Sequence, residues 1–88
     1  MISAEQAQEI VDKCLALGVD DATVSTLRQQ YPGIHFTYCL DDDLPNNQPV
    51  IEASGFNLYL VDGREHCLCL TNDFNIATGI VLAEIIAD

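Results

Sequence analysis

The chain has 88 residues, of which 49% are hydrophobic, so we expect one folded domain over residues 1–88 rather than a disordered acidic chain. Its 14 acidic residues face three basic ones, Lys13, Arg28 and Arg64, and the formal net charge is −11. This charge argues against nucleic acid and anionic membranes as partners, because both are themselves negative. We interpret the acidic surface as a contribution to solubility, with a dedicated basic protein partner as the alternative.

The sequence gives no sign of export or membrane insertion. No apolar run is long enough to cross a bilayer, and residues 1–7 lack the basic start and apolar centre of a signal peptide. We therefore expect a cytoplasmic protein whose four cysteines are reduced thiols rather than disulfides.

Two amphipathic helices are predicted at the start of the chain. Residues 3–6 have the sequence of a capping box, and Gly18 supplies a C-terminal stop for the first helix. Asp20 or Asp21 can cap the second helix, which runs to about Gln30. The residues expected to face inward are Ala7, Ile10, Val11, Cys14 and Leu15 on the first helix and Ala22, Val24, Leu27 and Tyr31 on the second. A DNA-binding helix-turn-helix is a poor match, since the second helix offers one basic residue and begins with two acidic ones.

An alternating strand is predicted next, from Ile34 to Leu40, and an irregular loop from Leu44 to Gly55. Two apolar-rich runs then flank Asp62-Gly63, a dipeptide that favours a tight hairpin turn. The inward residues of the first strand would be Ile34, Phe36, Tyr38 and Leu40, with His35, Thr37 and Cys39 on its other face. The core face of the hairpin would be Phe56, Leu58, Leu60, Leu68 and Leu70.

The last segment, from Phe74 to about Ala87, is predicted as a helix that is apolar on nearly every side. The expected order is therefore ααβββα, an α+β fold with a three-stranded, mainly antiparallel sheet packed by helices. One apolar strip of this helix would stay uncovered in so small a protein, which predicts a homodimer. The residues expected at that interface are Ile76, Ile80, Leu82 and Ile86.

A candidate metal site is formed in the pattern by Cys39, Cys67 and Cys69, with His35 as a further ligand. Two thiolates of a Cys-x-Cys segment can bind one zinc or iron ion, and the other two side chains could complete a tetrahedral site. The paired Cys-x2-Cys spacing of zinc knuckles is absent, and small buried thiols explain the same residues. We therefore expect no cofactor and keep metal or iron–sulfur handling as the alternative function.

Asp41, Asp42 and Asp43 form the second candidate site. The spacing and glycine of a calcium-binding loop are missing, so a solvated strand end is the favoured interpretation, and a surface for a basic partner is the alternative. Signatures of phosphate-binding loops, serine hydrolases and zinc proteases are also missing. A nucleophilic pair of Cys39 and His35 stays open, but we expect no enzymatic activity.

Three stretches together carry a resemblance to a known family: His35 to Cys39 with the acidic residues 41–43, Phe56 to Arg64, and His66 to Thr71. They resemble a family of small acidic bacterial proteins of unknown function that is associated with nitrogen-fixation gene neighbourhoods. The resemblance implies an accessory or regulatory role beside the nitrogenase apparatus, and it implies no catalytic residues. We therefore expect a small accessory protein that acts through protein–protein contacts.

Overall fold

The computed structural model describes residues 2–44, 48–63 and 69–85, and it begins with the two expected helices. Helix α1 spans Ala4–Leu17, and α2 spans Asp21–Gln30. The capping box of α1 is confirmed, because the Gln6 amide donates to the Ser3 hydroxyl at 3.0 Å and the Ser3 amide donates to the Gln6 side chain at 3.2 Å. Asp20 caps α2 by accepting from the Thr23 amide at 2.8 Å. Both helices therefore begin where local hydrogen bonding predicts.

A mixed sheet of five strands follows the helices. Its strands are β1 (His35–Leu40), β2 (Ile51–Ala53), β3 (Phe56–Asp62), β4 (Cys69–Thr71) and β5 (Gly79–Glu84), and a 3-10 turn η1 (Asp41–Asp43) follows β1. The spatial order is β1-β5-β3-β2, with β4 also paired to β3. Strand β1 runs parallel to β5, whereas all pairings of β3 are antiparallel. The α+β class is thus confirmed, but the sheet has five strands in the described residues instead of three, and the parallel β1–β5 pairing makes it mixed.

The predicted C-terminal helix is wrong, because residues 79–84 form the central strand β5. Successive side chains of a strand point to opposite faces, so Ile80 and Leu82 face the helices while Val81 and Ala83 face the other side. All four are at most 5% exposed. A strand buried on both faces is apolar at every position, and such a run cannot be told from a buried helix by periodicity alone.

The tight turn is also placed differently from the prediction. Ser54 and Gly55 connect β2 to β3 in a two-residue hairpin, in which Gly55 has a φ of 88° that other residues rarely adopt. Asp62 does not begin a two-residue turn, because it pairs with Cys69 of β4. The predicted loop over residues 44–55 therefore contains a strand and the hairpin turn.

The register of β4 corrects the predicted hairpin face. Leu70 lies directly opposite Val61, and residues directly opposite in an antiparallel pair share a face. Leu70 therefore packs against the cluster around Tyr59 rather than with Leu58 and Leu60. Leu68 lies outside the described residues.

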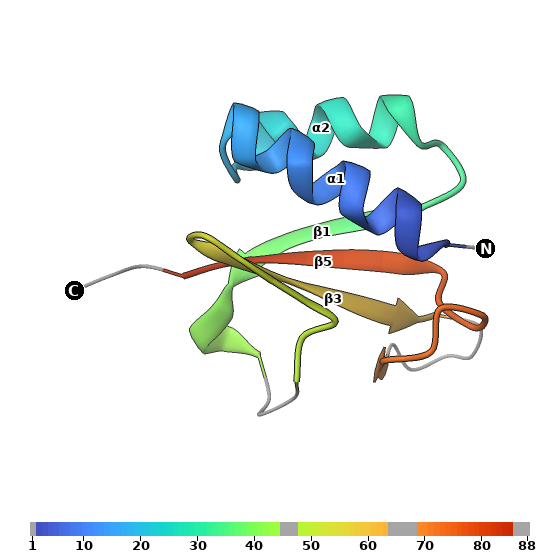
Figure 1. Cartoon of the computed structure of the whole chain (residues 1–88). Helices are drawn as coiled ribbons and strands as arrows, with labels where there is room; N and C mark the ends of the chain where they lie inside the picture. The colour runs from blue at the N-terminus through green and yellow to red at the C-terminus, as the bar shows by residue number, and fades with distance from the viewer. Residues whose placement is uncertain (1, 45–47, 64–68, 86–88) are drawn as a thin grey trace.

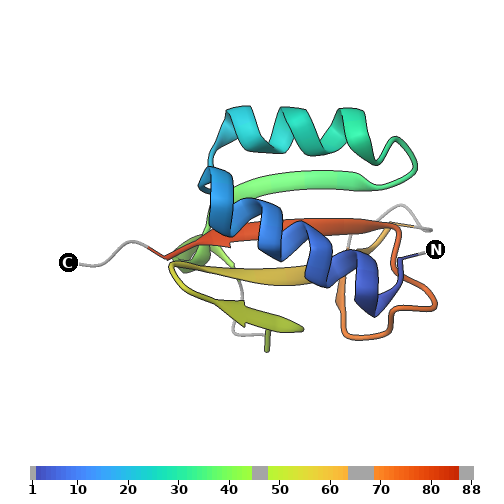
Figure 2. The same ribbon diagram turned by 45° about the horizontal axis from the view of Figure 1, so that its top comes forward.

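Both helices cover the same face of the sheet, and the main core lies between these two layers (Figures 1 and 2). Leu58, Leu60, Ile80 and Leu82 of the sheet are all but fully buried there. The helices contribute to this core Ala7, Ile10, Val11, Cys14, Val24 and Leu27. No helix within the described part of the chain is long and apolar enough to cross a membrane.

Candidate functional site

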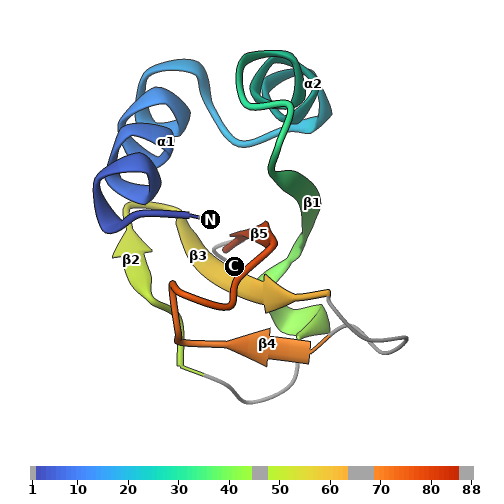
Figure 3. The same cartoon turned by 90° about the vertical axis from the view of Figure 1, so that its right-hand side faces the viewer.

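The face of the sheet turned away from the helices carries a second apolar cluster. Tyr59, Val81 and Ala83 are buried at its centre. Packed against them are the partly buried side chains of Cys39, Leu44, Val61 and Leu70. Among the described residues, neither α1 nor α2 covers this side of the sheet, and η1 and the edge strand β4 lie beside it (Figures 1 and 3). We call this surface the open face.

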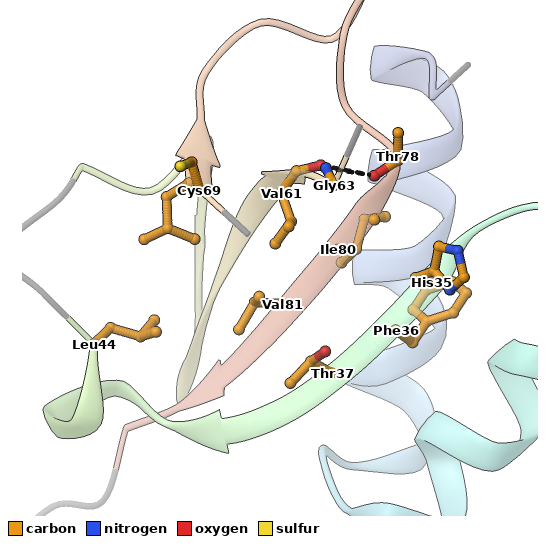
Figure 4. Close-up of a pocket in the computed structure, with 12 residues that line it drawn as sticks. His35, Phe36, Thr37, Leu44, Val61, Gly63, Cys69, Thr78, Ile80 and Val81 are labelled. Atoms are coloured by element: carbon orange, nitrogen blue, oxygen red, sulfur yellow. Dashed lines mark hydrogen bonds between the residues drawn. The ribbon is translucent and has the colours of Figure 1, made fainter. Parts of the chain in front are cut away.

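A cavity of about 920 Å³ lies on the open face, bounded by the sheet, β4 and Leu44. Figure 4 shows Thr37, Val81 and Val61 along its floor, contributed by β1, β5 and β3, which are neighbours in the sheet. The complete lining is His35, Phe36, Thr37, Leu44, Val61, Gly63, Cys69, Leu70, Thr78, Gly79, Ile80 and Val81. Its volume falls in the range of small-molecule sites, and most of the surface that lines it is apolar. The arrangement is suited to binding an apolar group.

Gly79 allows the strands that form the floor of the cavity to approach closely. A β-carbon at this position would lie 2.9 Å from the His35 carbonyl oxygen and 3.1 Å from the His35 β-carbon. Next to it, the Thr78 hydroxyl accepts from the Gly63 amide at 2.9 Å (Figure 4). The Thr78 amide also donates to the Val61 carbonyl at 2.8 Å. These contacts fix the end of β3 against the start of β5.

The acidic turn η1 lies beside the cavity, directly before Leu44. Asp41 is part of the packed structure, because its Oδ1 accepts from Asn57 Nδ2 at 3.1 Å and from the Tyr59 hydroxyl at 3.0 Å. Burial, with this hydrogen bond second, raises the pKa of Tyr59. Asp42 and Asp43 are exposed. The predicted solvated run is therefore one structural carboxylate followed by two that face solvent.

The two described cations are used on the helix side of the molecule. Lys13 donates to the Gln30 side chain at 2.9 Å and to the Tyr31 hydroxyl at 3.0 Å. Arg28 donates to the Phe36 carbonyl at 3.0 Å. Neither lines the cavity, and Arg64 lies outside the described residues. Within the described residues, the open face therefore offers carboxylates at its edge and no basic side chain in the cavity.

The structure separates the residues of the predicted metal site. Cys39 is level with Asn57 of β3, whereas Cys69 pairs with Asp62, roughly 17 Å further along that strand at about 3.3 Å per residue. His35 and Cys39 share a face of β1 but stand about 13 Å apart by the same spacing. Ligands of one zinc ion must all lie within about 2.3 Å of it, so these side chains cannot act together. Cys67 lies outside the described residues, and among those described no group of three His, Cys, Asp or Glu side chains could hold a metal ion.

The distance between Cys39 and His35 also rules out their direct pairing as nucleophile and base. Burial raises the pKa of the Cys39 thiol, and the negative charges of Asp43 and Asp41 raise it further. A raised pKa keeps the sulfur protonated, which is the less nucleophilic form. Cys14 and Cys39 are free thiols, and Cys14 is buried in the main core as expected.

The predicted interface residues do not form a common surface. Ile80 and Leu82 are buried in the main core, at 1% and 0% exposure, and are inaccessible to a partner. Ile76 is half-buried in the turn before β5, and Ile86 lies outside the described residues. Sequence reasoning missed the open face as a site, although the apolar Tyr59 and Val61 beside the inward Leu58 and Leu60 were a signal that β3 is covered on both sides.

Comparison with known proteins identifies a family but no activity. A family model described as "Family of unknown function (DUF6129)" matches residues 11–85. No curated protein and no solved structure matches the chain. The match agrees with the resemblance to a family of unknown function. Since it covers most of the sequence, the chain belongs to the family of unknown function DUF6129.

Proposed function

We propose that this protein is a small accessory protein, not an enzyme, that acts by binding another protein through its open face. The observation that carries the proposal is the cavity on a sheet whose other face is fully used by the helices. Apolar surface of this kind, bordered by polar residues, is typical of interaction sites. The resemblance noted for residues 35–71 supports an accessory or regulatory role beside the nitrogen-fixation machinery as the setting.

The open face is a different surface from the dimer helix that was expected from the sequence. The second apolar cluster on this face contains seven described side chains, which come from β1, β3, β4, β5 and the residue after η1. An aliphatic side chain of a partner that enters the cavity would remove part of its apolar lining, such as Leu44, Val61 and Leu70, from water, at roughly 25 cal/mol per Å² of apolar surface. The negative surface would favour a basic partner and speed its association.

Affinity purification from the native host tests the proposal with two matched variants. Thr37→Trp places a large side chain in the cavity from an exposed position, so the core stays intact. Ser25→Trp adds the same group on the exposed surface of α2. We expect the same partner with the wild-type protein and with Ser25→Trp, and its loss with Thr37→Trp. Equal recovery with all three proteins would contradict binding through the open face.

A further inference from the structure

The cavity on the open face selects an apolar group that carries no charge of its own. Its floor consists of Thr37, Val61 and Val81, and most of the surface that lines it is apolar. An ion placed there would lose its hydration without gaining an opposite charge, because the described residues of the lining include no Lys, Arg, Asp or Glu. The group that enters the cavity is therefore apolar and uncharged, and an aliphatic side chain meets both requirements.

The edge of the cavity selects positive charge next to that group. Asp42 and Asp43 are exposed there, one and two positions before the lining residue Leu44. Lys13 and Arg28 are engaged with other groups on the helix side, so the described residues offer no cation to neutralise this edge. Anionic ligands such as phosphates would be repelled at this edge.

A second copy of the chain is a poor occupant of the cavity, because it would also be repelled by the negative charge at this edge. A two-fold symmetric contact would place the same surface patch on both subunits. It would bring two acidic turns and two chains of net charge −11 together. Unlike charges across the contact are obtained only from a partner with basic residues.

We propose that the open face binds a protein segment in which an aliphatic side chain enters the cavity and neighbouring Lys or Arg side chains pair with Asp42 and Asp43. This inference rests on the proposed function and names the chemistry of the partner. Exposed ion pairs contribute modestly and are screened by salt, so the aliphatic anchor supplies most of the affinity and the carboxylates supply selectivity.

Isothermal titration calorimetry with three short synthetic peptides of equal length tests the inference. The first alternates lysine with leucine, the second alternates glutamate with leucine, and the third alternates lysine with serine. We expect binding of the lysine–leucine peptide that weakens as salt is raised, and no binding of the other two. Equal binding of the glutamate–leucine peptide, or no binding of the lysine–leucine peptide, would overturn the inference.

Two pairs of variants locate the bound peptide. Asp42→Asn combined with Asp43→Asn should weaken binding roughly two- to thirtyfold, the range for two exposed ion pairs. Glu5→Gln combined with Asp12→Asn changes the net charge equally on exposed positions of α1 and should leave affinity unchanged. Thr37→Trp should abolish binding, whereas Ser25→Trp should not. Equal effects of the two charge variants would mean that the edge carboxylates are not used.

The tests of the inference and of the proposed function can fail separately. If Thr37→Trp removes the native partner but the Asp42 and Asp43 variant retains it in full, the open face is the interface and the cationic partner is wrong. If light scattering shows a dimer that Thr37→Trp dissociates, the occupant is a second copy of the chain, and the inference is overturned.

Discussion

Gly79 shows how one residue without a side chain allows two strands of the open face to approach closely. Its place opposite His35 leaves no room for a β-carbon, and the nearest obstacle is backbone rather than a movable side chain. We expect Gly79→Ala to lower the free energy of unfolding by about 1–3 kcal/mol through overpacking. Gly33→Ala is the control, because nothing lies within 4 Å of a β-carbon there. Denaturant midpoints would contradict the close approach if both variants lost equal stability.

Tyr38 makes the stability of the folded protein depend on pH, and its hydrogen-bond partner Glu84 decides the sign of this dependence. The hydrogen bond that its hydroxyl donates to Glu84, then burial, then the charges of Glu84, Asp21 and Asp20 raise its pKa from 10.0 to about 12. Between these values the folded state keeps a proton that the unfolded state has lost. Its contribution to stability is therefore complete below about pH 10 and disappears as the pH rises to about 12.

The corresponding measurement is the slope of unfolding free energy against pH in the alkaline range. Tyr38→Phe should decline less steeply than the wild-type protein between pH 10 and pH 12. Part of the decline remains, because the pKa values of Cys14 and Tyr59 are raised as well. Identical slopes for the two proteins would show that Glu84 does not hold the Tyr38 proton.

At the scale of elements, local signals were sufficient where a helix cap decides the start of an element. The capping box at Ser3 and the cap at Asp20 are short-range hydrogen bonds that residue identity specifies, and both helices start there. Strand β5 could not be assigned in this way, because its apolar residues satisfy helical and extended patterns alike. Its assignment depends on the pairing with β1 and β3, which are distant in the sequence.

Because residues 79–84 form a buried strand and not a dimer helix, a charged substitution at Ile80 should unfold the protein instead of only dissociating a dimer. Ile80→Glu should unfold the protein, since it places an unpaired charge in the core at a side chain that is 1% exposed. Ile85→Glu, at a side chain that is 45% exposed just after β5, should stay folded. Circular dichroism and thermal unfolding distinguish the variants. A folded monomeric Ile80→Glu protein would contradict the strand.

At the scale of the whole molecule, the two sides of the sheet have different roles. The helix side contains the main core and both described cations, whereas the opposite side carries the second apolar cluster, the cavity and the acidic turn η1. The sequence already contained the components, in the apolar Val61, the exposed Thr37 and the aspartates of residues 41–43. Their proximity could not be predicted, because it depends on the parallel β1–β5 pairing and on the register of β4.

The most direct test of binding through the open face is backbone amide mapping by NMR during titration with the lysine–leucine peptide. The account predicts shift changes at Thr37, Val61, Leu70 and Val81 and in the acidic turn η1, with α1 and α2 unchanged. It would be contradicted by changes confined to α1 and α2, or by a saturating titration that leaves the amides of the open face where they were.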